Sequence, residues 1–488
     1  MAISFNSIPA NIRTVGQYIE FDSSRAVQGT PAKPHKALVI GQILAAGTMT
    51  VETLYHIASA SVGETLAGRG SILDAIIKAY KDQDPTMELW AIGVDDSGTA
   101  VDATGTFAIT GPATADGTFY AYVAGHRFAV AVSDTDTATD IGDALAAAIN
   151  ADTECPATAA NVTGTVTCTA RNGGTVGNGI DLRVNYYDGE DFPAGVGCTV
   201  TGMASGANDP DLTNALAAMA DEQWDTIVVA PNDTTNLGLV DAELDSRWGP
   251  MVQKEGHCYT GGYGNQSTLT TQGNAENSEF ITIVGAGLSP TPWWEWAARV
   301  AAIDAYQTTI DPARPRQTLK VDGVLAPHKS EIFTRAERNI LLTDGIATYT
   351  VGSDGSVYIE RLITTYQTNP ASVADTAYLD VVTMRTLAYL RYSMRTRVAL
   401  RYPRHKLADD GTRFGPGQAI VTPSILRTTL LQLFGEWETD GLVEGFEQFK
   451  TELIVERNAN DPNRIDVLAP PDLINQFRVL AAQIQFLV

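Results

Sequence analysis

The chain has 488 residues and a formal net charge of −24, and only 18% of its residues are charged. This length allows roughly two to four domains with a sizeable core. The acidity argues against general nucleic-acid binding and against binding to an anionic membrane surface. No apolar run approaches the length of a membrane span, and the N-terminal residues lack the pattern of a signal peptide. A surface this poor in charge is typical of a protein that buries much of itself against copies or partners.

Residues 1–34 carry several prolines and glycines but only one strand-like run, from Gly16 to Phe21. A solvated, disordered tail is one interpretation. The segment is more apolar than such tails usually are, because isoleucine, valine and aromatic residues recur along it. We therefore predict an extended N-terminal arm that docks on another surface, with Tyr18, Ile19 and Phe21 as its strand residues.

From Lys36 the chain alternates short apolar strands with helices, which is typical of an open, largely parallel α/β sheet. The expected strands are Ala37–Ile40, Glu88–Val94, Thr226–Ala230 and Phe280–Val284. The expected helices are Ser71–Tyr80 with Ser71 as N-cap, Asp211–Ala220, Thr234–Trp248, a helix with Thr291 as N-cap and Pro292 in its first position, and Ser330–Leu342. The predicted α/β domain is discontinuous and comprises residues 35–94 and 210–344.

Residues 95–209 differ in composition from the segments on either side. Thr, Gly, Ala and Asp dominate, lysine is absent, and arginine occurs only at Arg127, Arg171 and Arg183. Short strand-like runs alternate with turn signals, and one Ala-rich helix is expected at Ala138–Asn150. The pattern predicts a small β-rich domain inserted into a loop of the α/β domain, and its acidity favours an outward-facing position.

Residues 345–476 are expected to form a C-terminal α+β domain that begins with a β-hairpin and a helix. A second helix is expected at Thr422–Gly435, with Pro423 at its start, and a strand region at Phe446–Arg457. The runs Ile346–Val351 and Val357–Thr365 are rich in β-branched and aromatic residues, and Gly352 to Gly355 between them has turn chemistry. The hairpin is a natural acceptor for strands from elsewhere. Its predicted acceptor residues are Tyr349, Val351, Val357 and Ile359.

The helix expected from about Ala377 to Tyr402 is basic in an otherwise acidic chain. Its arginines are Arg385, Arg391, Arg395, Arg397 and Arg401. Arg391 and Arg395 flank one side of an apolar stripe, and Arg397 and Arg401 flank the other. Like charges four residues apart cost roughly 0.2–0.5 kcal/mol per pair in an isolated helix, so the pattern invites an anionic partner. A solvated face and ion pairs within the subunit are equally compatible with it, whereas the overall charge disfavours nucleic acid.

The last residues of the chain, 477–488, alternate in polarity as a β-strand does. Leu480, Ala482, Ile484 and Phe486 fall on one face, and Gln483 lies on the other. Prolines lie just before this run and also at the end of the N-terminal arm, and they would hold the chain extended at both places. Both ends therefore read as arms whose strands either complete their own sheet or add to a neighbour's.

Motifs for catalysis or cofactor binding are absent from the sequence. There is no HExxH, GxSxG or Walker A motif, and the four cysteines and six histidines show no metal-ligand spacing. Gly285-Ala-Gly287 lacks the third glycine of a dinucleotide fingerprint, which favours a strand-end turn. Trp293, Trp294 and Trp296 stand at helical spacing, which favours core packing over sugar or base stacking. We expect no catalytic residue, no cofactor and no metal.

Several phrases of the sequence resemble contractile-tail sheath proteins. They are Tyr358-Ile-Glu-Arg-Leu-Ile-Thr-Thr-Tyr-Gln-Thr368, Asp375-Thr-Ala-Tyr-Leu-Asp380 before the arginine helix, and Leu468-Ala-Pro-Pro-Asp-Leu-Ile-Asn-Gln-Phe-Arg478 with Gln483-Ile-Gln-Phe486. The opening Ile3–Ala26, with Gly16-Gln-Tyr-Ile-Glu-Phe21, is similar to the start of sheath proteins from Mu-like phages. The resemblance covers both ends and the C-terminal third, and it is weakest in the insert.

The resemblance implies a structural, non-enzymatic subunit of a virion tail that is assembled in the host cytoplasm. Such subunits form stacked hexameric rings around a tail tube, and their arms add strands to hairpin sheets of neighbours. Contraction then drives the tube through the host envelope. The implied partners are further copies of the chain, the tail tube protein, and the baseplate and tail terminator proteins, with neither nucleic acid nor membrane insertion. The arginine helix becomes a candidate tube-facing surface.

Three alternatives stay open on the sequence alone. A tailocin or a secretion-type injection system uses the same kind of sheath. A tail-tube or capsid protein would also be structural, although tube proteins are usually much smaller. An α/β enzyme with a β-rich insert belongs to a different class, and the absence of catalytic motifs and the strand-like arms at both ends disfavour it.

Overall fold

A computed structural model describes residues 11, 13–20, 33–415 and 417–487 of the chain. The largest element is a nine-stranded sheet with the order β14-β16-β15-β13-β12-β11-β1-β3-β2. Six neighbouring strands run parallel, from β15 to β3, and the strands at both edges are antiparallel. The sheet is thus mixed, whereas the sequence predicted a largely parallel one.

The central strands of this sheet are apolar and covered on both faces. Their bounds are β1 Lys36–Gln42, β3 Glu88–Val94, β11 Thr226–Val229, β12 His257–Tyr263, β13 Ile281–Gly287 and β15 Ile346–Val351, and the outer strands are β2 Leu54–Ile57, β16 Val357–Arg361 and β14 Lys320–Val321. Every residue of β11 and β13 is buried. Such continuous burial is what a parallel sheet between two helical layers requires.

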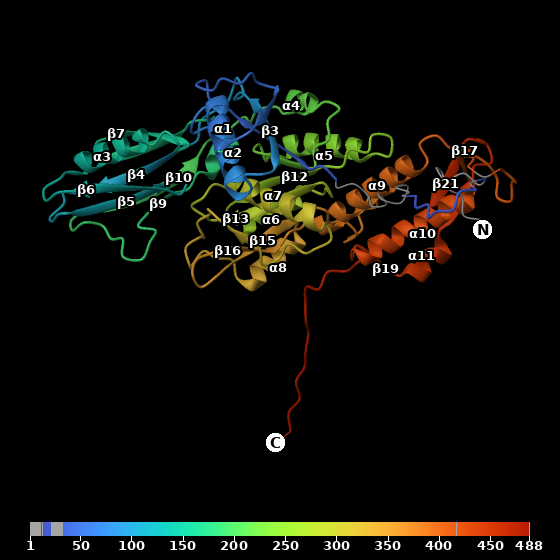
Figure 1. Cartoon of the computed structure of the whole chain (residues 1–488). Helices are drawn as coiled ribbons and strands as arrows, with labels where there is room; N and C mark the ends of the chain where they lie inside the picture. Colours follow the sequence, from blue (N-terminus) through green and yellow to red (C-terminus); the bar gives the residue numbers. More distant parts are fainter. Residues whose placement is uncertain (1–10, 12, 21–32, 416, 488) are drawn as a thin grey trace.

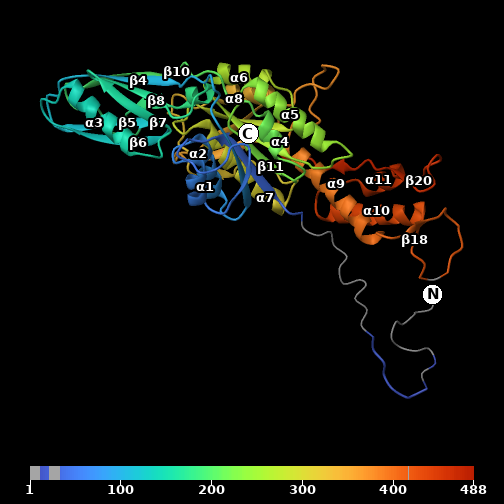
Figure 2. The same ribbon diagram turned by 90° about the horizontal axis from the view of Figure 1, so that it is seen from above.

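Helices cover both faces of the large sheet (Figures 1 and 2). One layer holds α1 (Ala60–Ala67), α2 (Ile72–Gln83) and α7 (Trp293–Ile310), and the other holds α4 (Thr213–Ala218), α5 (Thr234–Trp248), α6 (Gln266–Asn274) and α8 (Arg335–Thr343). The Ser71 hydroxyl accepts a hydrogen bond from Asp74 N, as the predicted N-cap of α2 should. Pro292 is the N-cap of α7, one position before the predicted place, and the three tryptophans that follow it are buried in the core.

The segment between β3 and α4 forms two small antiparallel sheets at one end of the molecule (Figure 1). One sheet has the order β10-β4-β8-β7 and the other β6-β5-β9. Their bounds are β4 Thr104–Thr110, β5 Gly117–Val123, β6 His126–Val132, β7 Ala157–Val162, β8 Thr165–Ala170, β9 Leu182–Val184 and β10 Gly197–Ala204, and the segment also holds helix α3 (Ala138–Ala151) and the short 3-10 helix η1 (Thr175–Gly179). The elements are thus β-rich with one helix; the boundaries at 95 and 209 stay a prediction.

Polar contacts fasten this β-rich segment to the large sheet. Gln42 donates to the Gly173 carbonyl at 2.6 Å, and Arg183 donates to the Leu288 carbonyl at 2.8 Å. A Cβ at Gly179 would lie 2.6 Å from the indole nitrogen of Trp293, so only glycine allows η1 to pack this closely on α7. We infer from these contacts that the segment projects as a rigid extension of the core.

The C-terminal residues form a separate helical unit with its own hydrophobic core (Figure 1). Its helices are α9 (Val381–Arg401), α10 (Pro423–Thr439) and α11 (Phe446–Glu452), and its short strand pairs are β17 (Lys406–Leu407) with β18 (Ile420–Val421), β19 (Val443–Glu444) with β22 (Asp472–Leu473), and β20 (Ile454–Arg457) with β21 (Ile465–Leu468). Leu430, Phe434 and Phe449 lie in this second core. The strand predicted over Phe446–Arg457 is wrong for its first half, which is α11.

The predicted hairpin β15–β16 exists, but it belongs to the large sheet. Ile346 of β15 pairs with Ile283 of β13 in parallel. The sequence grouped the hairpin with the C-terminal helices because the two are adjacent in the chain. The pairing with β13 joins it instead to the α/β core, and this grouping is corrected.

Among the described residues, no helix is both long and apolar enough to cross a membrane.

Candidate functional site: the arginine helix, the hairpins and the arms

Helix α9 bridges the large sheet and the C-terminal unit, and its arginines do not share one surface. Arg385 and Arg397 are buried, Arg391 and Arg401 are half-buried, and Arg395 is exposed. A buried side chain within the subunit cannot face a tube. The tube-facing prediction is therefore corrected for Arg385 and Arg397, and for the other three arginines it depends on their contacts.

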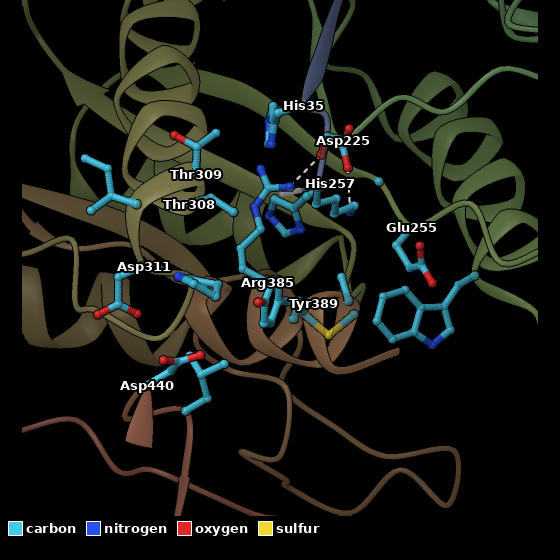
Figure 3. Close-up of a pocket in the computed structure, with 18 residues that line it drawn as sticks. His35, Asp225, Glu255, His257, Thr308, Thr309, Asp311, Arg385, Tyr389 and Asp440 are labelled. Atoms are coloured by element: carbon cyan, nitrogen blue, oxygen red, sulfur yellow. Dashed lines mark hydrogen bonds and ion pairs between the residues drawn. The ribbon is translucent and has the colours of Figure 1, made fainter. Parts of the chain in front are cut away.

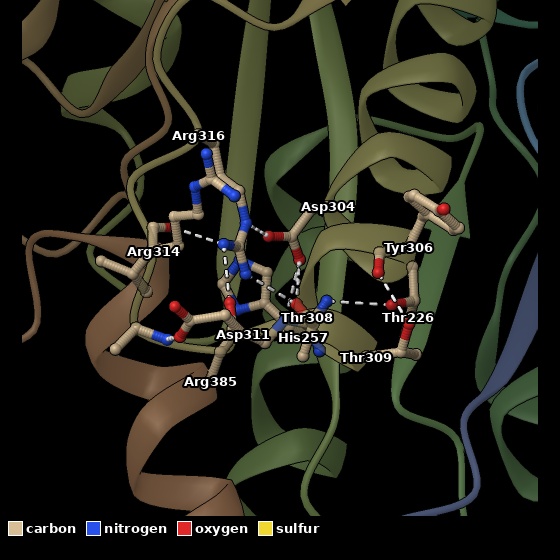
Figure 4. Close-up of polar contacts among 12 residues, drawn as sticks. Thr226, His257, Asp304, Tyr306, Thr308, Thr309, Asp311, Arg314, Arg316 and Arg385 are labelled. Atoms are coloured by element: carbon tan, nitrogen blue, oxygen red, sulfur yellow. Dashed lines mark hydrogen bonds and ion pairs between the residues drawn. The ribbon is translucent and has the colours of Figure 1, made fainter. Parts of the chain in front are cut away.

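Arg385 is part of a buried polar cluster between α9, α7 and the large sheet (Figure 4). Its Nε donates to Asp304 Oδ2 at 2.8 Å and its Nη2 donates to Thr226 Oγ1 at 2.9 Å. The other oxygen of Asp304 accepts from Arg316 Nε at 2.7 Å. The Tyr259 hydroxyl also donates to Asp304, at 2.7 Å. We call Asp304, Arg316, Arg385 and Tyr259 the Asp304 cluster.

The Asp304 cluster is electrostatically closed. Burial alone would raise the pKa of Asp304, but the charges of Arg385 and Arg316 hold that pKa well below its usual range. Burial and the neighbouring carboxylate raise the pKa of Tyr259. Asp304 is therefore a permanent carboxylate shared by two guanidinium groups, and its loss would leave two buried cations without a counter-ion. This arrangement fixes α9 to the sheet and leaves no group free for catalysis.

The remaining arginines of α9 also find partners in the subunit. Arg397 forms an ion pair with Glu436 of α10. Arg391 stacks 4.4 Å above the Trp248 ring and donates to the Trp248 carbonyl. Arg395 donates only to Gln253, and Arg401 donates to Gln432 at 2.8 Å. Pairing within the subunit, one of the alternatives open on the sequence, therefore accounts for most of the basic pattern.

A cavity of about 500 Å³ lies between the large sheet and the C-terminal unit (Figure 3). Lys33 and Asp225 line it and form an ion pair with an N–O distance of 2.6 Å. Burial lowers the pKa of His257 in its wall to about 3, so this histidine is neutral at physiological pH. Across the described part of the chain, no His, Cys, Asp and Glu side chains are grouped as metal ligands.

The predicted acceptor hairpin is partly covered at both of its edges, by two paired residues on β15 and two on β16. Tyr349, Val357 and Ile359 are buried, and Val351 is half-buried. β15 pairs with β13 on one side, and β14 covers β16 on the other, where Val321 pairs with Val357. The free edge at this end of the large sheet belongs to the two-residue strand β14. Nothing in Lys320-Val321 signals a strand, so the sequence could not show that β16 is already covered.

A second hairpin, β20–β21, was not predicted. Ile454 pairs with Leu468 and Arg457 pairs with Ile465, and within the described residues neither strand has a further partner. The apolar side chains of Ile454, Val467 and Leu468 are 50%, 40% and 61% exposed. The signal in the sequence is the turn-rich Asn458-Ala-Asn-Asp-Pro-Asn463 between two β-branched runs. Both edges of this hairpin are open for strand addition.

The C-terminal arm extends away from the body of the subunit (Figure 1). Residues 479–487 are exposed and pair with no strand in the described part of the subunit. Leu480, Ile484 and Phe486 are 78%, 88% and 82% exposed, and Ala482 is exposed with them. In the N-terminal arm, Tyr18 and Ile19 are also exposed, whereas Phe21 lies outside the described residues. Apolar side chains displayed in this way are typical of a segment that binds another surface.

Comparisons with known proteins match the whole chain. Residues 205–365 match the family model of the phage tail sheath protein central domain, and residues 373–487 match that of the phage tail sheath C-terminal domain. The Mu-like prophage FluMu tail sheath protein of Haemophilus influenzae is 43% identical over 488 residues, which cover all of both chains. This identity over the full length includes the β-rich segment that the two family models leave out.

Solved structures of sheath proteins are similar at lower identity. The sheath tail protein of Listeria innocua is 12% identical, with 91% of this chain and 93% of that chain covered and a TM-score of 0.48. The helical sheath of the anti-feeding prophage in its contracted state is 9% identical, with 97% and 99% covered and a TM-score of 0.47. The sequence matches carry the assignment: the chain belongs to the phage tail sheath family and is a structural, non-enzymatic subunit of a contractile, Mu-like phage tail.

Proposed function

We propose that this subunit polymerises as stacked hexameric rings around a tail tube and that contraction of the polymer drives the tube through the host envelope. The observation that carries the polymer is the C-terminal arm, whose alternating apolar side chains find no partner among the described residues of its own subunit. A strand of this kind gains main-chain hydrogen bonds and apolar contacts by adding to a neighbour's sheet.

The acceptor that the geometry favours is the open hairpin β20–β21. It offers two free edges, one for each arm of neighbouring subunits, and exposed apolar side chains lie along both strands. The hairpin β15–β16 is the weaker acceptor because β13 and β14 already occupy part of each of its edges. Added strands would convert β20–β21 from two strands, which are marginal alone, into a larger sheet.

The tube contact is proposed for the end of the C-terminal unit. This unit lies at the opposite end of the molecule from the β-rich segment, so one end faces the tube when the other faces outward (Figures 1 and 2). The cations are Arg395 on α9 and, in the segment that follows this helix, the exposed Arg404, Lys406 and Arg413. Exposed ion pairs are weak and screened by salt, which suits a contact that must release on contraction.

The ends of the polymer would meet a baseplate and a tail terminator, and assembly would take place in the host cytoplasm. Both follow from a role in a phage tail. The match to a prophage protein over the full length favours a phage or prophage tail over a secretion-type system.

The test places charges on one face of the C-terminal arm. Ile484→Asp together with Phe486→Asp should abolish polymers in negative-stain electron microscopy, because the apolar face can no longer pack on an acceptor. Gln483→Asp together with Gln485→Asp is the matched control, with the same charges on the opposite face, and it should polymerise. The subunit's unfolding temperature should not change in either variant, since both pairs are exposed. Normal tubes from the first variant would refute the proposal.

A further inference from the structure

The C-terminal arm has a fixed root that differs sharply from its free part. Gln476 donates to the Ala313 carbonyl at 2.6 Å, and Gln317 donates to the Phe477 carbonyl at 3.4 Å. Arg478 then donates through Nη2 to Asp380 Oδ1 at 2.9 Å, and its side chain is only 15% exposed. The next residue, Val479, is 81% exposed. The arm thus passes from held to free within one residue.

The carboxylate of Asp380 holds two parts of the subunit, the root of the C-terminal arm and the hairpin β15–β16. Arg361 at the end of β16 donates to both of its oxygens, at 3.0 and 2.9 Å. Asp380 also occupies the N-cap position of α9, where an aspartate commonly accepts from the helix's own amides, yet its side chain makes no such bond. The carboxylate is committed to the two arginines instead.

We propose that Asp380 is a positioning residue for the C-terminal arm: it clamps Arg478, sets the direction in which the arm leaves the subunit, and places the hinge of the arm between Arg478 and Val479. This inference deepens the proposed strand exchange and rests on it. Asp380 binds the root of the arm within its own subunit. Each subunit would therefore meet the neighbour that its arm reaches at a defined angle.

The clamp is also built to open. Arg478 has a buried Nε with no hydrogen-bond partner among the described residues. Burial lowers the pKa of Arg478, which shows that its guanidinium loses solvation at this place. A pull on the arm therefore has to break this ion pair and the two hydrogen bonds of Gln476 and Phe477, and the Arg478 guanidinium gains solvation in return. Release of residues 475–478 would add about 13 Å of reach, at roughly 3.3 Å per extended residue.

Tryptic cleavage after Arg478 reports on the clamp directly, because the rest of the arm contains no lysine or arginine. The experiment uses the full-length chain with Ile484→Asp and Phe486→Asp, because these two substitutions should prevent polymerisation. In this background Asp380→Asn should speed release of the 479–488 peptide about tenfold, measured by mass spectrometry. Arg338→Gln is the control: it removes an ion pair to Glu360, next to Arg361, that does not touch the arm. Equal rates in all three proteins would overturn the clamp.

A second variant covers the case in which Asp380→Asn disturbs α9. Arg478→Lys keeps a cleavable residue and leaves the Asp380–Arg361 pair intact, and it should also speed cleavage, because a lysine cannot reproduce the guanidinium geometry. If cleavage stays at the starting rate here, the clamp is refuted even when Asp380→Asn unfolds.

The polymer gives an independent readout on the unmodified arm. Asp380→Asn and Arg478→Lys polymers should differ from the natural polymer in helical twist or rise, measured by cryo-electron microscopy, whereas Arg338→Gln polymers should not. Unchanged twist and rise would overturn the positioning role alone. If instead the arm variant Ile484→Asp with Phe486→Asp still polymerised, the proposed strand exchange itself would fail, so the two failures are distinguishable.

Discussion

Helix α9 and the C-terminal arm differ in what they bury: α9 encloses charged groups, whereas the arm exposes apolar ones. At α9, the charges of Asp304, Arg316 and Arg385 are enclosed and satisfied within one subunit. Along the arm, Ile484 and Phe486 lie in solvent without a partner. Closed charges make a rigid joint between the large sheet and the C-terminal unit, and open apolar side chains make a connector. A subunit that moves as one body while staying linked to its neighbours needs both.

The largest effect should come from opening the rigid joint. Asp304→Ala leaves Arg385 and Arg316 buried without a counter-ion, which should lower the free energy of unfolding by about 3–5 kcal/mol. The measurement is urea denaturation in the unpolymerised arm variant. Glu447→Ala, which removes the exposed ion pair with Lys450, is the control and should cost less than about 1 kcal/mol. A similar small cost for both variants would mean that the joint does not depend on the Asp304 cluster.

A smaller effect should appear in the pH dependence of the same joint. Burial lowers the pKa of His257 to about 3, from 6.5 in the unfolded chain, so its contribution to stability is fully present above pH 6.5 and is lost as pH falls toward 3. Between pH 7.5 and 5 this residue should account for about 2 kcal/mol of lost stability. His257→Gln should flatten the pH dependence of unfolding by that amount. An unaltered slope in this variant would contradict the assignment.

The smallest effect should come from the exposed cations. Arg395→Glu together with Lys406→Glu should leave polymerisation intact and weaken co-sedimentation of the subunit with purified tail tubes about two- to fivefold, since each exposed ion pair contributes only about 0.2–1 kcal/mol. The loss should shrink as salt is raised. Lys450→Glu, on the exposed face of α11, is the control. Tube binding that is insensitive to the double variant would place the tube contact elsewhere.

The sequence predicted the elements better than their partners. The hairpin β15–β16, the cap Ser71, the helix that starts at Pro423 and the buried tryptophans of α7 follow from local patterns, and the structure contains them. The pairing of Arg385 with Asp304 joins residues that are 81 positions apart, and no local pattern shows such a contact. For the same reason helical spacing revealed that the arginines are arranged but not what they face.

The sequence also could not show which strand edges are open in the folded subunit. β14 has only two residues, too few for a period-2 signal, and yet it covers the predicted acceptor. β20 is short and follows α11 directly, so the sequence predicted one strand across both elements. The exposed ends were easier to find, because an alternating strand after two prolines has few other uses. Its acceptor depends on which edges the folded subunit leaves open.

Addition of the C-terminal arm of one subunit to the β20–β21 hairpin of another can be tested by disulfide cross-linking. Ile484→Cys combined with either Ile454→Cys on β20 or Val467→Cys on β21 tests it by oxidation of assembled polymers and denaturing gel electrophoresis. If the arm adds to either strand of this hairpin, at least one of the two pairs should give a ladder of covalent multimers. Ile484→Cys with Val162→Cys, on the exposed β7 of the β-rich segment, should give none. Multimers absent from both hairpin pairs in well-formed polymers would contradict the account.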